Sequence, residues 1–263
     1  MYVVRLAIRL AKILWCDIMV VTLWREKTIK IFCAMKENYV NVCFVVDQSG
    51  SMHGSESDII GGFQKVIEEQ RVIKEGKCTV SVFKFEDEVE ECFVGKDVNE
   101  VGELQYSPGG CTALNDAVCV AVDRMGEWLA AMPEEERPAM NMVVVITDGM
   151  ENASRRFSHN DVKQRIQHQE EVYNWKFVYL GANITDAQEA QDLGFQRMAF
   201  SAKGDLADNL SGFSNRIFYK MRAEGLSSIK EILFDEALNE MTENYEEKLG
   251  HEIKNKKVSK SKK

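Results

Sequence analysis

The chain has 263 residues, enough for one large domain or two small ones, and its 45% hydrophobic and 29% charged residues are ordinary for a globular protein. The net charge is -9, and because both ends of the chain are basic, the stretch between them is more acidic still. An acidic surface repels phosphate, so we expect no nucleic-acid binding by the core of the protein.

Seven cysteines are scattered along the chain, an odd number that includes no Cys-x-x-Cys pair. Cys43, Cys78 and Cys92 lie in or beside apolar, β-branched runs, where a free thiol behaves as a small hydrophobic side chain. We therefore expect neither a disulfide framework nor a thiolate metal site. Free thiols suit a reducing environment, which favours a cytoplasmic location.

Residues 1–34 form an N-terminal extension that carries six basic side chains ahead of the first predicted strand. Its longest run without a charge, 18–24, is far shorter than the ~20 apolar residues that span a bilayer, so we do not expect a membrane protein. Three of the basic residues recur at helical spacing, and an interfacial amphipathic helix is one interpretation. We favour another, in which the native protein starts at Met35 and the upstream residues are an extension of the reading frame.

Val42–Val46 is a short apolar run, rich in β-branched residues, and it predicts a strand buried on both faces. In Asp58–Lys74 the apolar residues fall on one helical face, and Gly76 follows as an end signal. Cys78–Phe85 and Val89–Val94 alternate on either side of an acidic turn, which predicts two antiparallel strands. The first part of the domain is therefore expected to hold a buried strand, an amphipathic helix and a hairpin.

Strands and helices alternate downstream of the Pro-Gly-Gly loop at Ser107–Cys111. The predicted elements are, in order, the helix Ala113–Met132, the strand Met142–Ile146, the helix His159–Tyr173, the strand Lys176–Leu180, the helix Asp186–Leu193, the strand Phe195–Phe200 and the helices Asp205–Arg222 and Ser227–Lys248. This alternation predicts an α/β fold of the Rossmann-like, doubly wound type. Its sheet is expected to be mostly parallel, with one antiparallel edge strand and helices on both faces.

The C-terminal part of the chain is divided into a helix and a tail that follow this domain. We assign residues 35–222 to the domain, 223–250 to a C-terminal helix and 251–263 to a lysine-rich, disordered tail. The helix carries an apolar stripe, which predicts that it packs on the domain, although such a stripe can also serve as a partner surface.

Three polar clusters lie at the ends of predicted elements. Asp47–Ser51 follows the first strand, Gly109–Thr112 leads into a helix, and Thr147–Gly149 follows the second buried strand. In an open α/β sheet, ligands bind beyond the carboxyl ends of the strands. We therefore expect the three clusters to converge on one point.

Two carboxylates and three hydroxyls in these clusters are suited to one hard cation. Asp47 and Asp148 supply negative charge, whereas Ser49, Ser51 and Thr112 supply neutral oxygen atoms. Mg²⁺ prefers oxygen ligands of this kind. The sequence therefore predicts a site for a single divalent cation.

The combination of D-x-S-x-S, a threonine after Gly-Gly, and T-D-G resembles the metal-ion-dependent adhesion site of the von Willebrand factor A (vWA) family, in the form found in stand-alone bacterial and phage members. The resemblance covers roughly residues 40–222, and all five motif positions match. It implies that Ser49, Ser51 and Thr112 contact the metal directly, and that Asp47 and Asp148 act through bound waters.

Neighbouring positions add to the resemblance and include one departure. Asp116, in the first turn of a predicted helix, and Asn152, in a T-D-G-x-x-N form of the third motif, are similar to residues of family members. Cys111 departs from the family, in which threonine or serine commonly precedes the metal-binding threonine. A thiol at this position could make the site sensitive to oxidation.

The resemblance implies a protein-binding module rather than an enzyme. The cation is expected to be Mg²⁺, with Mn²⁺ as an alternative, and a partner protein is expected to donate an Asp or Glu to it. One alternative is an adaptor of a MoxR-type or chelatase-like AAA ATPase. A weaker alternative is a metal-dependent phosphohydrolase of the haloacid dehalogenase type, but its second acid is replaced by Ser49.

Overall fold

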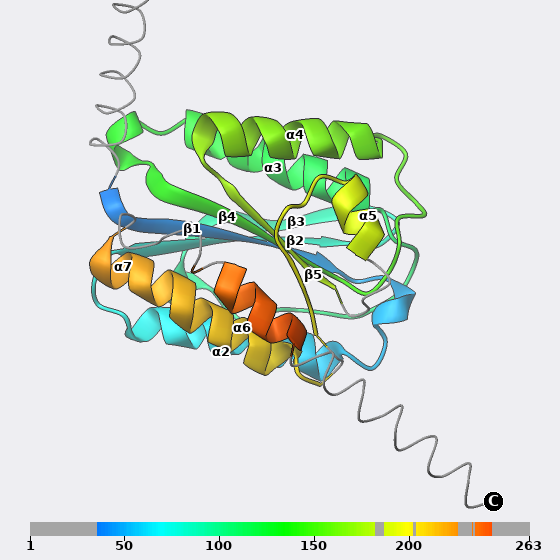
Figure 1. Cartoon of the computed structure of the whole chain (residues 1–263), viewed down its shortest axis with the longest axis horizontal. Helices are drawn as coiled ribbons and strands as arrows, with labels where there is room; N and C mark the ends of the chain where they lie inside the picture. The colour runs from blue at the N-terminus through cyan, green and yellow to red at the C-terminus, as the bar shows by residue number, and fades with distance from the viewer. Residues whose placement is uncertain (1–35, 182–186, 202–203, 226–232, 234, 244–263) are drawn as a thin grey trace, which may run out of the picture.

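Figure 1 shows one twisted sheet between two layers of helices. The computed structural model describes residues 36–181, 187–201, 204–225, 233 and 235–243. The strands are β1 (Lys36–Asp47), β2 (Lys77–Phe85), β3 (Val89–Asp97), β4 (Pro138–Thr147), β5 (Lys176–Gly181) and β6 (Met198–Phe200). The helices are η1 (Gly50–Met52), α2 (Glu56–Val72), η2 (Val98–Glu100), α3 (Leu114–Ala130), η3 (Glu134–Glu136), α4 (His159–Tyr173), α5 (Ala187–Asp192), α6 (Leu206–Ser214), η5 (Asn215–Tyr219) and α7 (Lys220–Glu224).

The strand order of the sheet is β3-β2-β1-β4-β5-β6. β1 lies parallel to both β2 and β4, the pairs β4–β5 and β5–β6 are also parallel, and only the edge strand β3 is antiparallel to its neighbour within the described sheet. The predicted doubly wound α/β fold with one antiparallel edge strand is thus confirmed. From β1 the chain first adds β2 and β3 on one side and then β4, β5 and β6 on the other, so the strand order switches between β1 and β4. Sheets of this type bind ligands at such a switch point.

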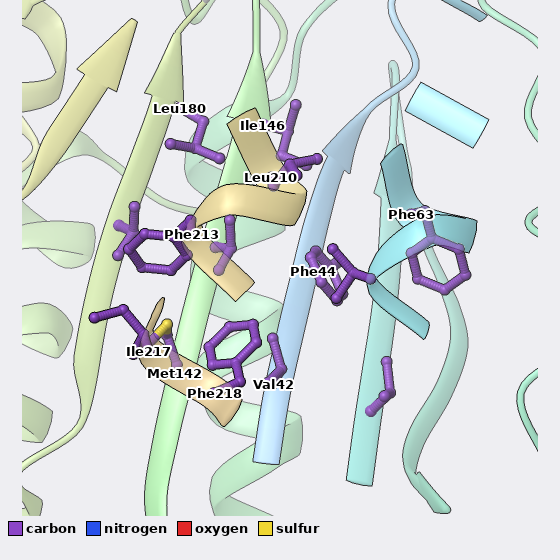
Figure 2. Close-up of a cluster of buried hydrophobic side chains, with 14 of the residues drawn as sticks. Val42, Phe44, Phe63, Met142, Ile146, Leu180, Leu210, Phe213, Ile217 and Phe218 are labelled. Carbon is purple, nitrogen blue, oxygen red and sulfur yellow. The ribbon is translucent and has the colours of Figure 1, made fainter. Parts of the chain in front are cut away.

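The core lies on both faces of the sheet because side chains alternate along each strand. On one face, α2, α6 and α7 cover a cluster that includes Phe44, Met142 and Phe213 (Figure 2). On the other face, α3, α4 and α5 cover a cluster that includes Val45 and Phe177. The two layers bury the central strands and leave their carboxyl ends at one edge of the domain.

The first strand is longer than the run Val42–Val46 from which it was predicted. Its earlier part contains Asn41, a buried polar residue whose side chain donates to Asn141 Oδ1 at 3.3 Å and accepts from Thr79 Oγ1 at 3.1 Å. Hydropathy identifies the apolar part of a strand, whereas these polar side chains are buried because they pair across the sheet.

The last helices differ from the prediction in one respect. The predicted helix Asp205–Arg222 is divided into α6, the π-helical turn η5 and α7. The sequence does not reveal this turn, because a single wider turn hardly changes the spacing of the apolar residues. Beyond them, 235–243 is helical and buries Ala237, Leu238 and Met241 in the core cluster with Phe44, as expected for a C-terminal helix that packs on the domain.

Five cysteines in the described part of the chain are free: Cys43, Cys78, Cys92, Cys111 and Cys119. Cys43, Cys78 and Cys119 are buried, and burial raises the pKa of the Cys78 thiol to about 12, so these thiols act as apolar side chains. The predictions for 1–34, for the tail 251–263 and for the remaining two cysteines lie outside the described residues. None of the helices described is both long and apolar enough to cross a membrane.

Candidate metal centre

Asp47 is the last residue of β1, and its side chain is fixed by neighbours on both sides. Oδ1 accepts the Ser49 N–H at 2.7 Å, and Oδ2 accepts the Thr147 hydroxyl at 2.5 Å. The Tyr106 hydroxyl donates to the main-chain oxygen of Asp47 at 2.6 Å. Burial raises the pKa of Asp47 to about 6 against the effect of these side-chain hydrogen bonds, and the charge of Asp148 raises it further.

Main-chain hydrogen bonds join the loop after β1 to the glycine loop before α3. The Gly50 N–H donates to Gly110 O at 3.1 Å, and the Gly109 N–H donates to Gln48 O at 2.7 Å. Gly110 has a φ of 68°, and a Cβ added there would lie 2.8 Å from Asp87 Oδ2. Only glycine fits this position without strain, so the close approach of the two loops depends on it.

The hydroxyl groups of the two loops point to one region. Ser49 Oγ and Ser51 Oγ lie 3.0 Å apart, with Ser49 buried and Ser51 exposed to solvent. A Cβ added to Gly149 would lie 3.1 Å from Thr112 Oγ1, 3.2 Å from Ser51 Oγ and 3.7 Å from Asp47 Oδ2. The absence of a side chain at Gly149 therefore leaves a small space bordered by oxygen atoms from two loops and a strand end.

Asp148 is placed beside this space because it connects Thr147, the last residue of β4, to Gly149. It is half-buried, and its charge acts on the Asp47 carboxylate. The structure thus brings Asp47, Ser49, Ser51 and Thr112 together at the end of the two central strands, with Asp148 next to them.

The loop that follows β4 holds Thr112 from the other side. Asn152 Oδ1 accepts the Thr112 N–H at 2.9 Å. In return, the N–H groups of Asn152 and Ala153 donate to Thr112 O at 3.0 Å and 3.2 Å. The position of the threonine hydroxyl is therefore tied to the residues that come directly after Asp148 and Gly149.

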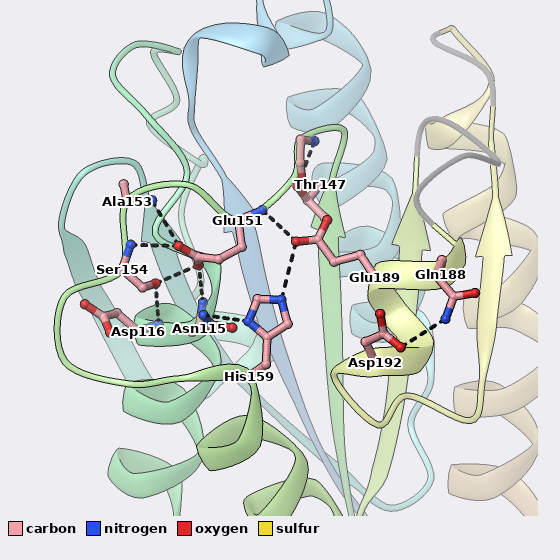
Figure 3. Close-up of polar contacts among 11 residues, drawn as sticks. Asn115, Asp116, Thr147, Glu151, Ala153, Ser154, His159, Gln188, Glu189 and Asp192 are labelled. Atoms are coloured by element: carbon pink, nitrogen blue, oxygen red, sulfur yellow. Dashed lines mark hydrogen bonds and ion pairs between the residues drawn. The ribbon is translucent and has the colours of Figure 1, made fainter.

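Glu151 organises the same loop, as Figure 3 shows. Its carboxylate accepts the N–H groups of Asn115, Ala153 and Ser154 at 2.8, 2.9 and 2.7 Å, and the Ser154 hydroxyl at 2.7 Å. Its own N–H donates to the buried Glu189 on α5 at 2.7 Å. Nothing in the spacing of these residues indicated the contacts, because most of the donors are main-chain groups.

The donor set fits a hard divalent cation because it consists of oxygen atoms alone. The set consists of two carboxylates, from Asp47 and Asp148, and three hydroxyls, from Ser49, Ser51 and Thr112. Soft metals that need thiolate or imidazole ligands do not match this chemistry.

A family model of the von Willebrand factor type A domain matches residues 41–216. The chain belongs to this family. The match begins within β1 and ends in η5, so it includes the second half of β1, the other five strands and the five residues predicted to bind metal. No curated protein sequence matches the chain.

Several solved structures are similar to this vWA domain at low identity. They include a paralog of ArnB from Sulfolobus acidocaldarius (15% identity, TM-score 0.44, 66% of this chain and 44% of that chain), a von Willebrand factor type A protein from Catenulispora acidiphila (13%, 0.48, 68% and 42%) and manganese-loaded TRAP protein from Plasmodium vivax (15%, 0.46, 70% and 74%). The chain spans less than half the length of the first two.

Two further side chains lie at the rim of the site in this vWA domain. His53 is exposed and forms a contact of 3.3 Å with Glu56, so it is a solvated loop residue. Cys111 is exposed, and the pKa of its thiol is raised, chiefly by a hydrogen bond with Asp87, while the charge of Arg155 has the opposite effect.

Proposed function

We propose that this vWA domain is a protein-binding module that depends on a divalent cation. Asp47, Ser49, Ser51, Thr112 and Asp148 would hold the ion, with Mg²⁺ as the expected metal and Mn²⁺ as the alternative. The observation that supports the proposal is the convergence of Thr112 Oγ1, Ser51 Oγ and Asp47 Oδ2 on the space at Gly149.

The electrostatics of Asp47 also favour a cation at this position. Its carboxylate is buried beside Asp148, and its pKa is raised because burial is not compensated by a positive charge. Among the described residues, no lysine or arginine forms an ion pair with Asp47. A divalent ion next to both aspartates would supply the missing charge.

The ligand set suggests how a partner would be captured. Three of the five oxygen donors are neutral hydroxyls, so a bound ion keeps much of its affinity for a further carboxylate. Ser51 is exposed, which gives the site access to solvent at the edge of the sheet. An Asp or Glu side chain of a partner protein is the expected ligand, and an AAA ATPase is one class of protein that would provide it.

We propose binding rather than catalysis. The candidate nucleophile of a phosphohydrolase would be Asp47, at the end of β1. The residue two positions later is Ser49, which cannot act as a general acid. The free thiols further favour a cytoplasmic setting for this interaction.

The test is affinity capture from cell extract with the full chain as bait. Wild type is used in Mg²⁺ and in EDTA, and Thr112→Ala is used in Mg²⁺. Partners are expected in wild type with Mg²⁺ and are expected to be lost in the other two samples. Cys111→Ser is the matched control, because it changes the exposed residue next to Thr112 and replaces the thiol with a hydroxyl of similar size. Recovery of the same proteins from all samples would refute the proposal.

A further inference from the structure

Arg155 and Arg156 differ from the other arginines of the described chain. Both are exposed, and within the described residues neither guanidinium has a hydrogen bond or an ion pair; Arg156 only lies over the Phe157 ring, at 5.2 Å. All other described arginines donate to carboxylates or to carbonyl oxygens: Arg71, Arg124, Arg137, Arg165, Arg197, Arg216 and Arg222. Two neighbouring guanidinium groups are thus free for an external ligand.

The main chain of this pair is held firmly even though its side chains are exposed. The buried carboxylate of Asp116 accepts the N–H of Arg155 at 3.0 Å, that of Arg156 at 3.1 Å and that of Phe157 at 2.9 Å. Asp116 belongs to the first turn of α3, four residues after Thr112. A buried carboxylate with three main-chain donors fixes the turn to the helix that starts at the candidate metal centre.

A second set of contacts connects the turn that carries Arg155 and Arg156 to the candidate metal centre. Asn152 and Ala153, which directly precede the turn, donate to Thr112 O. The charge of Arg155 reaches the thiol of Cys111, the residue before Thr112. The main chain of the pair is therefore held near the candidate metal centre, with Arg155 close enough for its charge to act on Cys111.

We propose that Arg155 and Arg156 form a second recognition element, which binds another carboxylate of the same partner segment whose first carboxylate reaches the metal. The inference rests on the proposed function and names its partner class as a protein segment with two or more acidic residues. The net charge of -9 repels such a segment at long range, and a local pair of unpaired guanidinium groups offsets this repulsion where contact is made. Guanidinium is also geometrically matched to carboxylate, since both groups are planar.

A nucleic acid fits this surface less well. Nucleic-acid binding usually depends on several phosphate contacts along an extended basic surface, whereas here the basic element is two residues on an acidic domain.

The experiment uses the full chain and short fluorescein-labelled peptides of glycine and serine that carry either one glutamate or two glutamates at increasing separations. In Mg²⁺, fluorescence polarisation is expected to give about twofold to fivefold tighter binding for the best two-glutamate peptide, as one exposed ion pair supplies. Arg155→Gln or Arg156→Gln is expected to reduce this gain. Lys74→Gln removes one exposed positive charge just beyond the end of α2, at the opposite edge of the sheet, and is expected to retain the gain.

The possible results separate this inference from the proposed function. Equal Mg²⁺-dependent affinity for peptides with one and two glutamates would overturn the role of the arginines and leave metal-dependent capture intact. Affinity that is the same in Mg²⁺ and EDTA for every peptide would overturn the proposed function itself. A single-stranded oligonucleotide that displaces the two-glutamate peptide from wild type but binds Arg155→Gln poorly would overturn the choice of an acidic protein as partner.

Discussion

The hydroxyl of Thr147, at the end of β4, donates a hydrogen bond of 2.5 Å to Oδ2 of Asp47, at the end of β1. The same hydroxyl lies 3.1 Å from the main-chain oxygen of Gly149, which is a second acceptor within reach. A neutral side chain at position 47 that carries a donor can therefore still link the two central strands, because the Thr147 hydroxyl can accept from it while donating to Gly149 O. Substitution of Asp47 should alter the charge of the site more than its framework.

We expect Asp47→Asn to abolish cation binding while the metal-free fold stays at least as stable as wild type. The asparagine oxygen can still accept the Ser49 N–H, and the amide can donate to Thr147 while Thr147 donates to Gly149. A neutral side chain also avoids the cost of a buried carboxylate. Thermal unfolding measures both effects: Mg²⁺ should raise the Tm of wild type, relative to EDTA, and leave that of the variant unchanged.

The exposed Asp208→Asn is a matched control for this substitution. It removes one acidic charge from α6 and should preserve the Mg²⁺-dependent rise in Tm. If Asp47→Asn retained the same rise, Asp47 would not belong to the metal site.

The metal-free protein should lose stability as the pH rises through the titration of Asp47. Burial raises the pKa of this carboxyl from 3.8 to about 6, so the folded protein binds the proton more tightly than the unfolded chain. The extra stability is present below about pH 4 and disappears as the pH rises through about 6, for a total on the order of 3 kcal/mol. Urea unfolding in EDTA at about pH 5 and about pH 8 should show a larger loss for wild type than for Asp47→Asn. Parallel pH profiles would show that Asp47 is not the titrating group.

Gly149→Ala should block the metal site and leave the fold intact. The new Cβ would occupy the space between Thr112 Oγ1 and Ser51 Oγ, at 3.1 Å and 3.2 Å, and Gly149 does not have a positive φ that would strain an alanine. Calorimetric titration with Mg²⁺ or Mn²⁺ should detect binding to wild type only. Gly61→Ala is the control: it fills open space on α2, should raise stability by up to about 1 kcal/mol and should bind metal normally. Wild-type metal uptake by Gly149→Ala would exclude this space as the binding position.

The residues of the candidate centre could be predicted because they occur in continuous motifs at the ends of apolar strands. Asp47 follows β1 directly and Asp148 follows β4 directly, and the carboxyl ends of neighbouring parallel strands meet at one edge. Hydropathy thus located each motif at the end of a strand, and the parallel arrangement of the strands predicted that the motifs meet at one edge of the sheet. The same logic predicted the sheet, with its antiparallel edge strand β3.

The supporting contacts could not be predicted in the same way. Glu151, Asp116 and Glu189 accept N–H groups of a loop, and a main-chain donor is present at every residue other than proline, so sequence does not indicate which donors will be bound. The hydrogen bond from Tyr106 to the main-chain oxygen of Asp47 is equally hard to predict, because every residue has such an oxygen. Such contacts depend on the relative placement of elements that are distant in the chain.

Glu151→Gln tests whether these supporting contacts organise the metal site. The Glu151 carboxylate accepts four hydrogen bonds, whereas glutamine has one acceptor oxygen and an NH₂ group that would face the donors of Ala153 and Ser154. We expect a loss of about 2 to 4 kcal/mol in the free energy of unfolding, measured with urea, because partly buried donors lose their partners. The affinity of the folded protein for Mg²⁺ should also fall, because Asn152 in the same loop holds Thr112.

The exposed Glu135→Gln, which removes a charge on η3, should change neither quantity. Two results would contradict the argument in different ways. Unchanged stability of Glu151→Gln would mean that its hydrogen bonds are replaced by water at no cost. Reduced stability with unchanged Mg²⁺ affinity would mean that the glycine loop places the Thr112 hydroxyl by itself, through its main-chain bonds to the loop after β1.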